Sequence, residues 1–234
     1  MKKTTTILLL ILLLTNYSFS QDKGYVAISL GPSIPIGDFA STDLNNSSSG
    51  LAKTGAIFDI TFAYKLGTNM GLTAMLRGQS NPVDNQSLLD QLNREDPTIS
   101  WRVDSKNWGI GGFMFGGYGS FPIATGKTSF EGRAMIGFLS ASSPDLTLSG
   151  TQNGISAWAK LNSTTSTSFA YLIGAGFKFN VGAKICLLTN LDFMGSSAEF
   201  KNARTTNSAG TFSEETITQK FGTINFGIGI GLRL

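Results

Sequence analysis

The alternation of side chains near the end of the chain constrains the fold more than any other feature. Apolar residues at Ile224, Phe226, Ile228, Ile230, Leu232 and Leu234 alternate with Asn225, Gly227, Gly229, Gly231 and Arg233. Successive side chains of a β-strand point to opposite faces, so this segment predicts a strand with one apolar face. The same alternation recurs along the chain, and a face that is apolar in strand after strand needs lipid or a very large second layer to cover it.

Eight stretches of this kind are joined by connections of two lengths. We expect strands at about 24–35, 55–66, 70–79, 108–121, 129–139, 169–179, 184–194 and 224–234. Turns of a few residues alternate with polar connections at about 38–50, 80–106, 140–166 and 195–218. This rhythm is typical of an all-β fold, the eight-stranded antiparallel up-and-down transmembrane β-barrel with short periplasmic turns and long extracellular loops.

Two segments are less regular than the rest. The expected strand at 108–121 contains six glycines that blur its alternation, so the sequence leaves its facing open. The connection at 80–106 is predicted to hold a short amphipathic helix over 81–95, with Asn81 as its cap and Pro82 in its first position. Such a helix is either a lid or partner-binding element or, as we favour, a segment folded over the barrel rim.

The N-terminal residues 1–20 have the features of a secretory signal peptide. Lys2 and Lys3 precede an apolar run over 7–14, and Ser18 and Ser20 provide a small-residue cleavage site. The run is too short to span a bilayer as a helix. We therefore expect a signal peptide at 1–20, cleaved on export through the inner membrane, and one outer-membrane β-barrel domain at 21–234.

Composition excludes several classes of function. The formal net charge of +3 includes the two signal-peptide lysines, so it gives no reason to expect a nucleic-acid partner. The chain has no histidine, the commonest general base and metal ligand. Its single cysteine, Cys186, is predicted to be a small interior residue. We predict no catalytic residues, no metal site and no cofactor, and a protein that is not an enzyme.

The strand pattern also places charged residues on the inner face. An eight-stranded barrel is just wide enough to be filled by side chains, and buried charges need partners. If Leu66 faces Met70 across the short turn, antiparallel register sets Asp59 opposite Arg77. We predict a salt-bridged network in the lumen with a structural role, formed by Asp59, Arg77, Glu131, Arg133 and Asp192. An acid–base role for Glu131 and Asp192 is the less favoured alternative, because such neighbours neutralise them.

Three segments carry a resemblance to a known family, at 31–39 (GPSIPIGDF), 116–122 (GGYGSFP) and 227–234 (GIGIGLRL). With them the chain resembles the small outer-membrane β-barrel family, often labelled porin-like, that is related in architecture to OmpX and to the transmembrane domain of OmpA. The resemblance implies outer-membrane lipid around the barrel and insertion by the outer-membrane assembly machinery. That machinery reads the final strand and often prefers a terminal aromatic residue, where this chain has Leu234.

The function that these observations favour is that of a structural outer-membrane protein with a filled lumen. Its surface loops are then available for contacts with ligands or with an extracellular or envelope protein partner. Two alternatives stay open, a narrow porin or small-solute channel and an accessory subunit of a secretion or surface-assembly complex. A membrane-embedded enzyme acting on lipids is disfavoured by the missing histidines.

Overall fold

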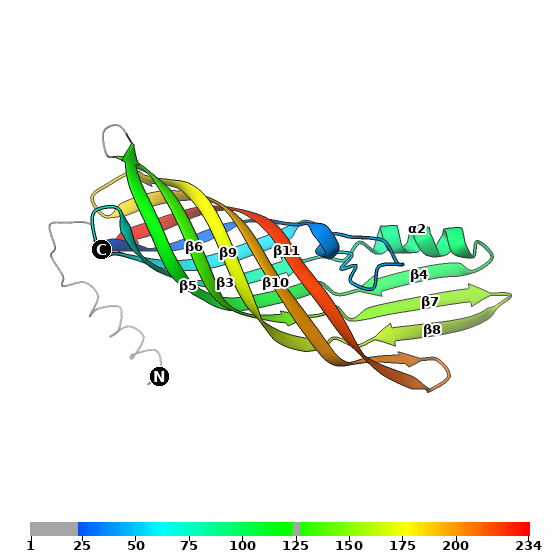
Figure 1. Ribbon diagram of the computed structural model, residues 1–234. Helices are drawn as coiled ribbons and strands as arrows, with labels where there is room; N and C mark the ends of the chain where they lie inside the picture. Colours follow the sequence, from blue (N-terminus) through cyan, green and yellow to red (C-terminus); the bar gives the residue numbers. More distant parts are fainter. Residues whose placement is uncertain (1–22, 124–126) are drawn as a thin grey trace, which may run out of the picture.

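Antiparallel β-strands make up nearly all of the molecule (Figure 1). A computed structural model describes residues 23–123 and 127–234. The predicted signal peptide at 1–20 lies outside these residues. Within the described part of the chain, no helix is both long enough and apolar enough to cross a membrane.

Eight strands close into a ring. They are β1 (Gly24–Pro35), β2 (Gly55–Lys65), β3 (Met70–Asn81), β5 (Trp108–Ile123), β6 (Thr128–Ser142), β9 (Thr165–Asn180), β10 (Ile185–Asn207) and β11 (Phe212–Arg233). Each strand pairs antiparallel with the next one in this order, and β11 also pairs with β1. The predicted eight-stranded antiparallel barrel is confirmed. A closed ring suits hydrocarbon, because an unpaired backbone N–H or C=O costs several kcal/mol there.

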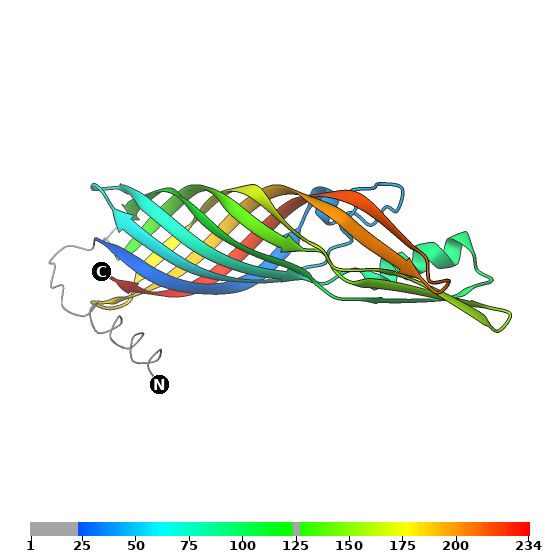
Figure 2. The ribbon, with the colours of Figure 1, turned by 90° about the horizontal axis from the view of Figure 1, so that it is seen from below.

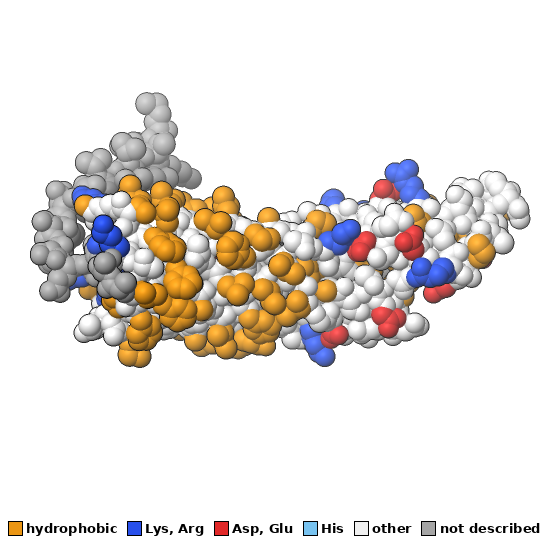
Figure 3. All heavy atoms as spheres, turned by 90° about the horizontal axis from the view of Figure 1, so that it is seen from above, with side chains coloured by type: hydrophobic (Ala, Val, Ile, Leu, Met, Phe, Trp, Pro, Cys, Tyr) orange, Lys and Arg blue, Asp and Glu red, His pale blue; other side chains and the backbone are white. Residues whose placement is uncertain are grey.

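The predicted division into an outer apolar face and an inner face is also confirmed. In β2, Phe58 and Phe62 are 43% and 44% exposed, whereas Ile57 and Asp59 are 3% and 2% exposed. Figure 3 shows the resulting apolar band over the barrel half of the molecule, with the acidic side chains of that view lying beyond it. A soluble monomer rarely exposes so large an apolar surface, so lipid is the natural solvent of this band.

The structure settles the facing of β5, which the sequence left open. Met114 and Tyr118 are buried in the lumen, whereas Phe113 and Phe115 are 51% and 48% exposed on the outer face. Glycine is needed in this strand where it passes close to β6, since a Cβ on Gly116 would overlap the backbone of that neighbour. Close backbone approach thus explains Gly116 and Gly112, while the alternation of the larger side chains shows that the strand does not change face.

Much of the sequence in the long connections forms strands, which we did not predict from the sequence. The arms of β10 and β11 continue through most of 195–218, while the connection at 140–166 contains β7 (Leu146–Gln152) and β8 (Ile155–Leu161). The connection at 80–106 contains β4 (Ser100–Ser105). Strands β8, β7 and β4 follow the distal part of β10 in that order, and together with the distal parts of β10 and β11 they form a sheet that protrudes from one end of the barrel (Figures 1 and 2). We call this the protruding sheet.

A β-bulge marks the passage of β10 from the ring into the protruding sheet. The register with β11 shifts between Phe200 and Ala203, and Asn202 has a left-handed φ of 55°. Asparagine tolerates that conformation better than most residues. Because one extra residue reverses the facing, Phe200 and Ala203 both point inward although their numbers differ in parity.

The predicted helix is present, but it begins later than expected. Helix α2 spans Asn85–Glu95, and its cap is Asp84 rather than Asn81. The Asp84 carboxylate accepts hydrogen bonds from the backbone N–H of Ser87 at 3.1 Å and from its hydroxyl at 2.9 Å. Partial burial disfavours the charged form of this carboxylate and so raises its pKa. The hydrogen bonds from Ser87 and the positive charge of Lys53 have the larger combined effect, and the pKa of Asp84 is lowered.

Asn81 makes its contacts within the barrel and not at the start of the helix. It is the last residue of β3 and pairs with Trp108 of β5. Its buried side-chain amide donates to the carbonyl oxygens of Ser33 at 3.2 Å and Lys53 at 2.9 Å. The first connection, which includes the short 3₁₀ helix η1 (Gly37–Phe39), is thereby tied to the rim.

Introducing a charged residue in the centre of the apolar band tests whether this face contacts lipid. Ile228 is 59% exposed in the middle of the ring segment of β11. We expect Ile228→Lys to lower the free energy of unfolding in phospholipid vesicles by about 2–4 kcal/mol, measured by urea titration. The control Thr216→Lys, in the exposed part of the same strand beyond the band, should change it little. Equal effects of the two substitutions would contradict the assignment.

Candidate functional site

The charged side chains of the lumen come from the inner faces of five ring strands, β2, β3, β6, β9 and β10. Asp59 in β2 and Arg77 in β3 lie directly opposite one another in the antiparallel ladder. Arg77 donates from Nε to Asp59 Oδ1 at 2.7 Å and from Nη2 to Asp59 Oδ2 at 2.6 Å. Both side chains are buried, at 0% and 3% exposure. This two-point geometry is the strongest form of a carboxylate–guanidinium pair.

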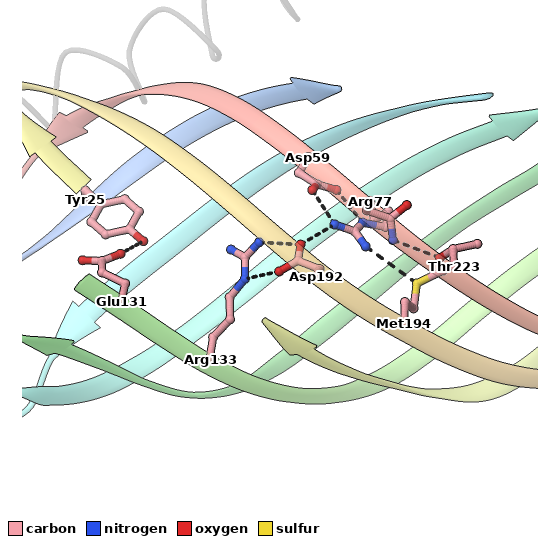
Figure 4. Close-up of polar contacts among 9 residues, drawn as sticks. Tyr25, Asp59, Arg77, Glu131, Arg133, Asp192, Met194 and Thr223 are labelled. Atoms are coloured by element: carbon pink, nitrogen blue, oxygen red, sulfur yellow. Dashed lines mark hydrogen bonds and ion pairs between the residues drawn. The ribbon is translucent and has the colours of Figure 1, made fainter. Parts of the chain in front are cut away.

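Asp192 in β10 extends this pair across the lumen. Its Oδ2 accepts from Arg77 Nη2 at 3.0 Å, and its two oxygens accept from Arg133 of β6 at 3.0 and 2.7 Å. Figure 4 shows the four side chains in series, Asp59, Arg77, Asp192 and Arg133. Two carboxylates and two guanidinium groups leave the series neutral, which is the condition for burying charge at low cost.

Glu131 lies outside this series, although the sequence grouped it with the other four residues. Its Oε2 accepts from the Tyr25 hydroxyl at 2.8 Å, and its Oε1 lies 3.3 Å from Lys178 Nζ. Lys178 Nζ also lies 5.3 Å from the centre of the Tyr25 ring, within cation–π range. The charged side chains of the lumen therefore form two separate ion-paired sets. Reasoning from the sequence missed Tyr25, whose inward facing the alternation with Val26 could have indicated.

Aromatic side chains close the lumen at the end that carries the protruding sheet. Phe39 of η1 is 0% exposed and packs edge-on against Phe221 and Trp108, with ring centres 4.9 and 5.7 Å apart. Phe200 joins them from β10. The Trp108 indole donates to the carbonyl oxygen of Gly50 at 2.8 Å, so the first connection is folded into the barrel mouth.

The two cavities found at the barrel do not form a channel through it. An interior cavity lined by Tyr25, Tyr118 and Glu131 has a volume of about 10 Å³, room for about one water molecule. A hollow of about 780 Å³ lies on the outside of the barrel, where Gly195 and Tyr171 are among its lining residues. The ion-paired Asp38 and Lys220 also line it, so this hollow lies at the outer edge of the apolar band and not in the lumen.

The chemistry available to these residues is limited. Among the described residues, no group of three or more His, Cys, Asp or Glu side chains is placed to hold a metal ion. Asp192 is held by two guanidinium groups and Glu131 by a hydroxyl and an ammonium group. Each of these carboxylates therefore has two polar partners inside the lumen.

No protein-family model and no curated protein matches the chain. Among solved structures, it is similar to Neisserial surface protein A at 9% identity and a TM-score of 0.49, covering 90% of this chain and 97% of that one. It is similar to Ail, the attachment invasion locus protein of Yersinia pestis, at 15% identity and 0.43, covering 91% and 99%. The outer membrane protease OmpT from Escherichia coli follows at 10% identity and 0.37, covering 94% and 99%.

These similar structures are small outer-membrane β-barrel proteins, the class that the sequence resembles. At such identities and TM-scores they carry no residue roles over to this chain. The fold assignment depends on the ring of strand pairings itself.

Removing the central guanidinium tests the ion-pair series. Arg77→Met keeps most of the side-chain volume but leaves Asp59 without its partner, and breaking a buried pair costs about 3–5 kcal/mol. We expect a loss of that size in urea unfolding, with part of it recovered when Asp59→Asn is added. Arg102→Met, which breaks the exposed pair with Asp104 at 2.7 Å, should have no measurable effect. Wild-type stability of Arg77→Met would show that the series contributes nothing.

Proposed function

We propose that this protein is a structural outer-membrane barrel whose lumen is closed to solutes and whose protruding sheet is its contact surface. Residues 1–20 direct its export, and residues 21–234 form one domain surrounded by outer-membrane lipid. The outer-membrane assembly machinery inserts that domain. The single observation that most supports a closed lumen is the buried series of ion pairs from Asp59 to Arg133.

A conducting pore would leave such groups in contact with water. Instead, Asp59, Arg77 and Asp192 have side chains at most 3% exposed. Asp192 lies on β10, across the ring from the neighbouring strands β2 and β3 that carry the other two, so together they bridge the lumen. An interior that only accommodates side chains is also what an eight-stranded barrel provides.

The same observations support a role without catalysis, metal or cofactor. An acid–base pair needs one carboxyl group free to exchange a proton with a substrate. Glu131 and Asp192 each have two partners of their own, and the adjacent cavity of about 10 Å³ admits no substrate. The lumen residues thus have a structural role.

Electrical recording distinguishes the closed barrel from a narrow porin. We expect the purified protein to give no discrete conductance steps in planar lipid bilayers at either polarity. A water-filled porin reconstituted in parallel provides the positive control. A reproducible unitary conductance of the folded protein would overturn the closed lumen and favour the small-solute channel.

The second part of the proposal depends on the surface of the protruding sheet. Trp158 of β8 and Phe212 of β11 are 44% and 60% exposed, and both lie on strands of the protruding sheet. The Arg204 guanidinium lies 4.2 Å from the centre of the Phe212 ring. Exposed aromatic and arginine side chains on rigid strands are the groups that dominate protein contacts. A protein partner on this surface is therefore proposed.

Crosslinking in intact cells tests this contact surface. A photoreactive amino acid at Trp158 or at Phe212 should give the same protein adduct, identified by mass spectrometry. The same probe at Ile228, in the apolar band, should not give it. Adducts with components of a secretion or surface-assembly complex would identify the protein as an accessory subunit. Absence of protein adducts at both positions would contradict a contact role for the sheet.

A further inference from the structure

The hollow on the outside of the barrel lies where the neighbouring strands β9, β10 and β11 meet the first connection (Figure 1). Its volume of about 780 Å³ is within the range of small-molecule sites, about 300–1,000 Å³. Its walls include Phe169 and Tyr171 of β9, Phe193 of β10 and Ile36, which follows β1. The three aromatic side chains are exposed on the outer face of the ring, so the walls belong to the apolar band. We call this hollow the outer groove.

Two glycines form the floor of the outer groove. Gly195 of β10 and Gly222 of β11 lie directly opposite one another in the ladder, two residues beyond the outward pair Phe193–Ile224. Both glycines therefore lie on the outer face. The Tyr171 ring covers Gly195, where a Cβ would overlap it. Because two adjoining outer positions have no side chain, the surface of the apolar band is hollowed there.

The outer groove is charged at the end that is directed toward the protruding sheet. Ser197 and Lys220 are the next outward pair of the same ladder. Lys220 Nζ lies 3.5 Å from Asp38 Oδ2 of the first connection, and the two side chains are 67% and 33% exposed. An ammonium group has three donors, so Lys220 can keep Asp38 as a partner and contact a second anionic group. The groove is thus apolar along its floor and walls and charged at one end, which suits an amphiphile.

The surroundings of the outer groove favour an acyl chain as its occupant. Hydrocarbon offers no water to fill a depression, and an empty depression leaves its lining atoms without dispersion contacts. A symmetric pair of two copies would place the same hollow on both sides of the interface and leave it unfilled. A lipid chain is flexible and apolar, so it can follow the aromatic walls, and its headgroup then lies near Lys220.

We propose that the outer groove binds one acyl chain of a membrane phospholipid, with the phosphate of that lipid at Lys220. The site differs from the rest of the band because it combines a recess with a charge at its outer end. The bound lipid covers the place where β1 leaves β11, beyond the pair Pro35–Thr223. The inference depends on the lipid-facing band, and not on whether the lumen conducts or on what the protruding sheet contacts.

Photolabelling in detergent micelles tests the outer groove, because detergent covers the rest of the band and only a preferred lipid is retained. The probe is phosphatidylglycerol with a diazirine in one acyl chain, added in equimolar amount to the purified protein. Its phosphate is its only charge. We expect adducts, mapped by mass spectrometry, to concentrate around Tyr171 and Phe193. The stretch around Phe115 of β5, which is 48% exposed on the same band, should be labelled little.

A substitution at the floor tests the chain-binding part of the site. A Cβ on Gly222 would lie 3.2 Å from Ile36 Cγ1 and from the Ile36 carbonyl oxygen, so Gly222→Leu fills the groove with a small shift of Ile36. Labelling should fall about tenfold, since one methylene group too many in an apolar pocket costs about that much. The control Gly78→Leu adds the same side chain to β3, where the nearest atom is 3.9 Å from the new Cβ, and should not lower labelling.

A substitution at the charged end tests the phosphate contact. Lys220→Gln should lower labelling about fivefold, because one lysine contributes about that much at an anionic lipid surface. The control Lys201→Gln breaks another exposed pair, 3.9 Å from Glu199, and should leave labelling unchanged. Heat-dependent gel mobility verifies that each variant is folded. Phe193→Ala, which removes a wall of the groove, replaces Gly222→Leu if that variant does not fold.

Five results would overturn the proposal. They are adducts spread evenly over the band, equal labelling of the two leucine variants, equal labelling of the two glutamine variants, displacement of the probe by soluble glycerol phosphate, and a dimer through this face that excludes the probe. Displacement by glycerol phosphate would assign Lys220 to free anions, and the dimer would make the groove an interface between two copies. The lipid-facing band itself is tested separately by Ile228→Lys.

Discussion

Hydrocarbon supplies no hydrogen-bond partners, and this one constraint orders the barrel. Every ring strand pairs on both sides, and β11 closes the ring onto β1 from the pair Tyr25–Arg233 to the pair Pro35–Thr223. Once the backbone is satisfied within the ring, only the outer side chains have to suit lipid. Beyond the band, water satisfies the backbone, so the distal part of β11 tolerates an open edge where β1 has ended.

The narrow interior follows from the number of strands and explains the chemistry of the lumen. Charges enclosed by eight strands have little water to solvate them, so they persist only when neutralised. The series Asp59–Arg77–Asp192–Arg133 meets this condition, and the pair of Glu131 with Lys178 meets it separately. The buried ion pairs and the lipid-facing band are thus the inner and outer faces of one ring of eight strands.

The sequence anticipated one contact between two named residues, because its geometry is set locally, and it grouped Arg133 and Asp192 with that pair without saying which of them touch. Asp59 and Arg77 lie 18 positions apart, and the short turn between their strands fixes the register that brings them together. Tyr25 and Glu131 lie 106 positions apart on strands that are not neighbours in the ring. Their contact depends on how the strands tilt across the lumen, and the alternation of side chains along one strand does not specify that tilt.

The sequence by itself determined the number of ring strands, the lipid-facing sides of all of them except β5, and their short turns, because alternation and turn chemistry act within a few residues. Only the tertiary structure decided which parts of the long connections form strands. Their segments become strands because each finds its ladder partner in another connection, as β8 does in the distal part of β10. The bulge between Phe200 and Ala203, which reverses the facing of β10, likewise exists only where two strands are paired.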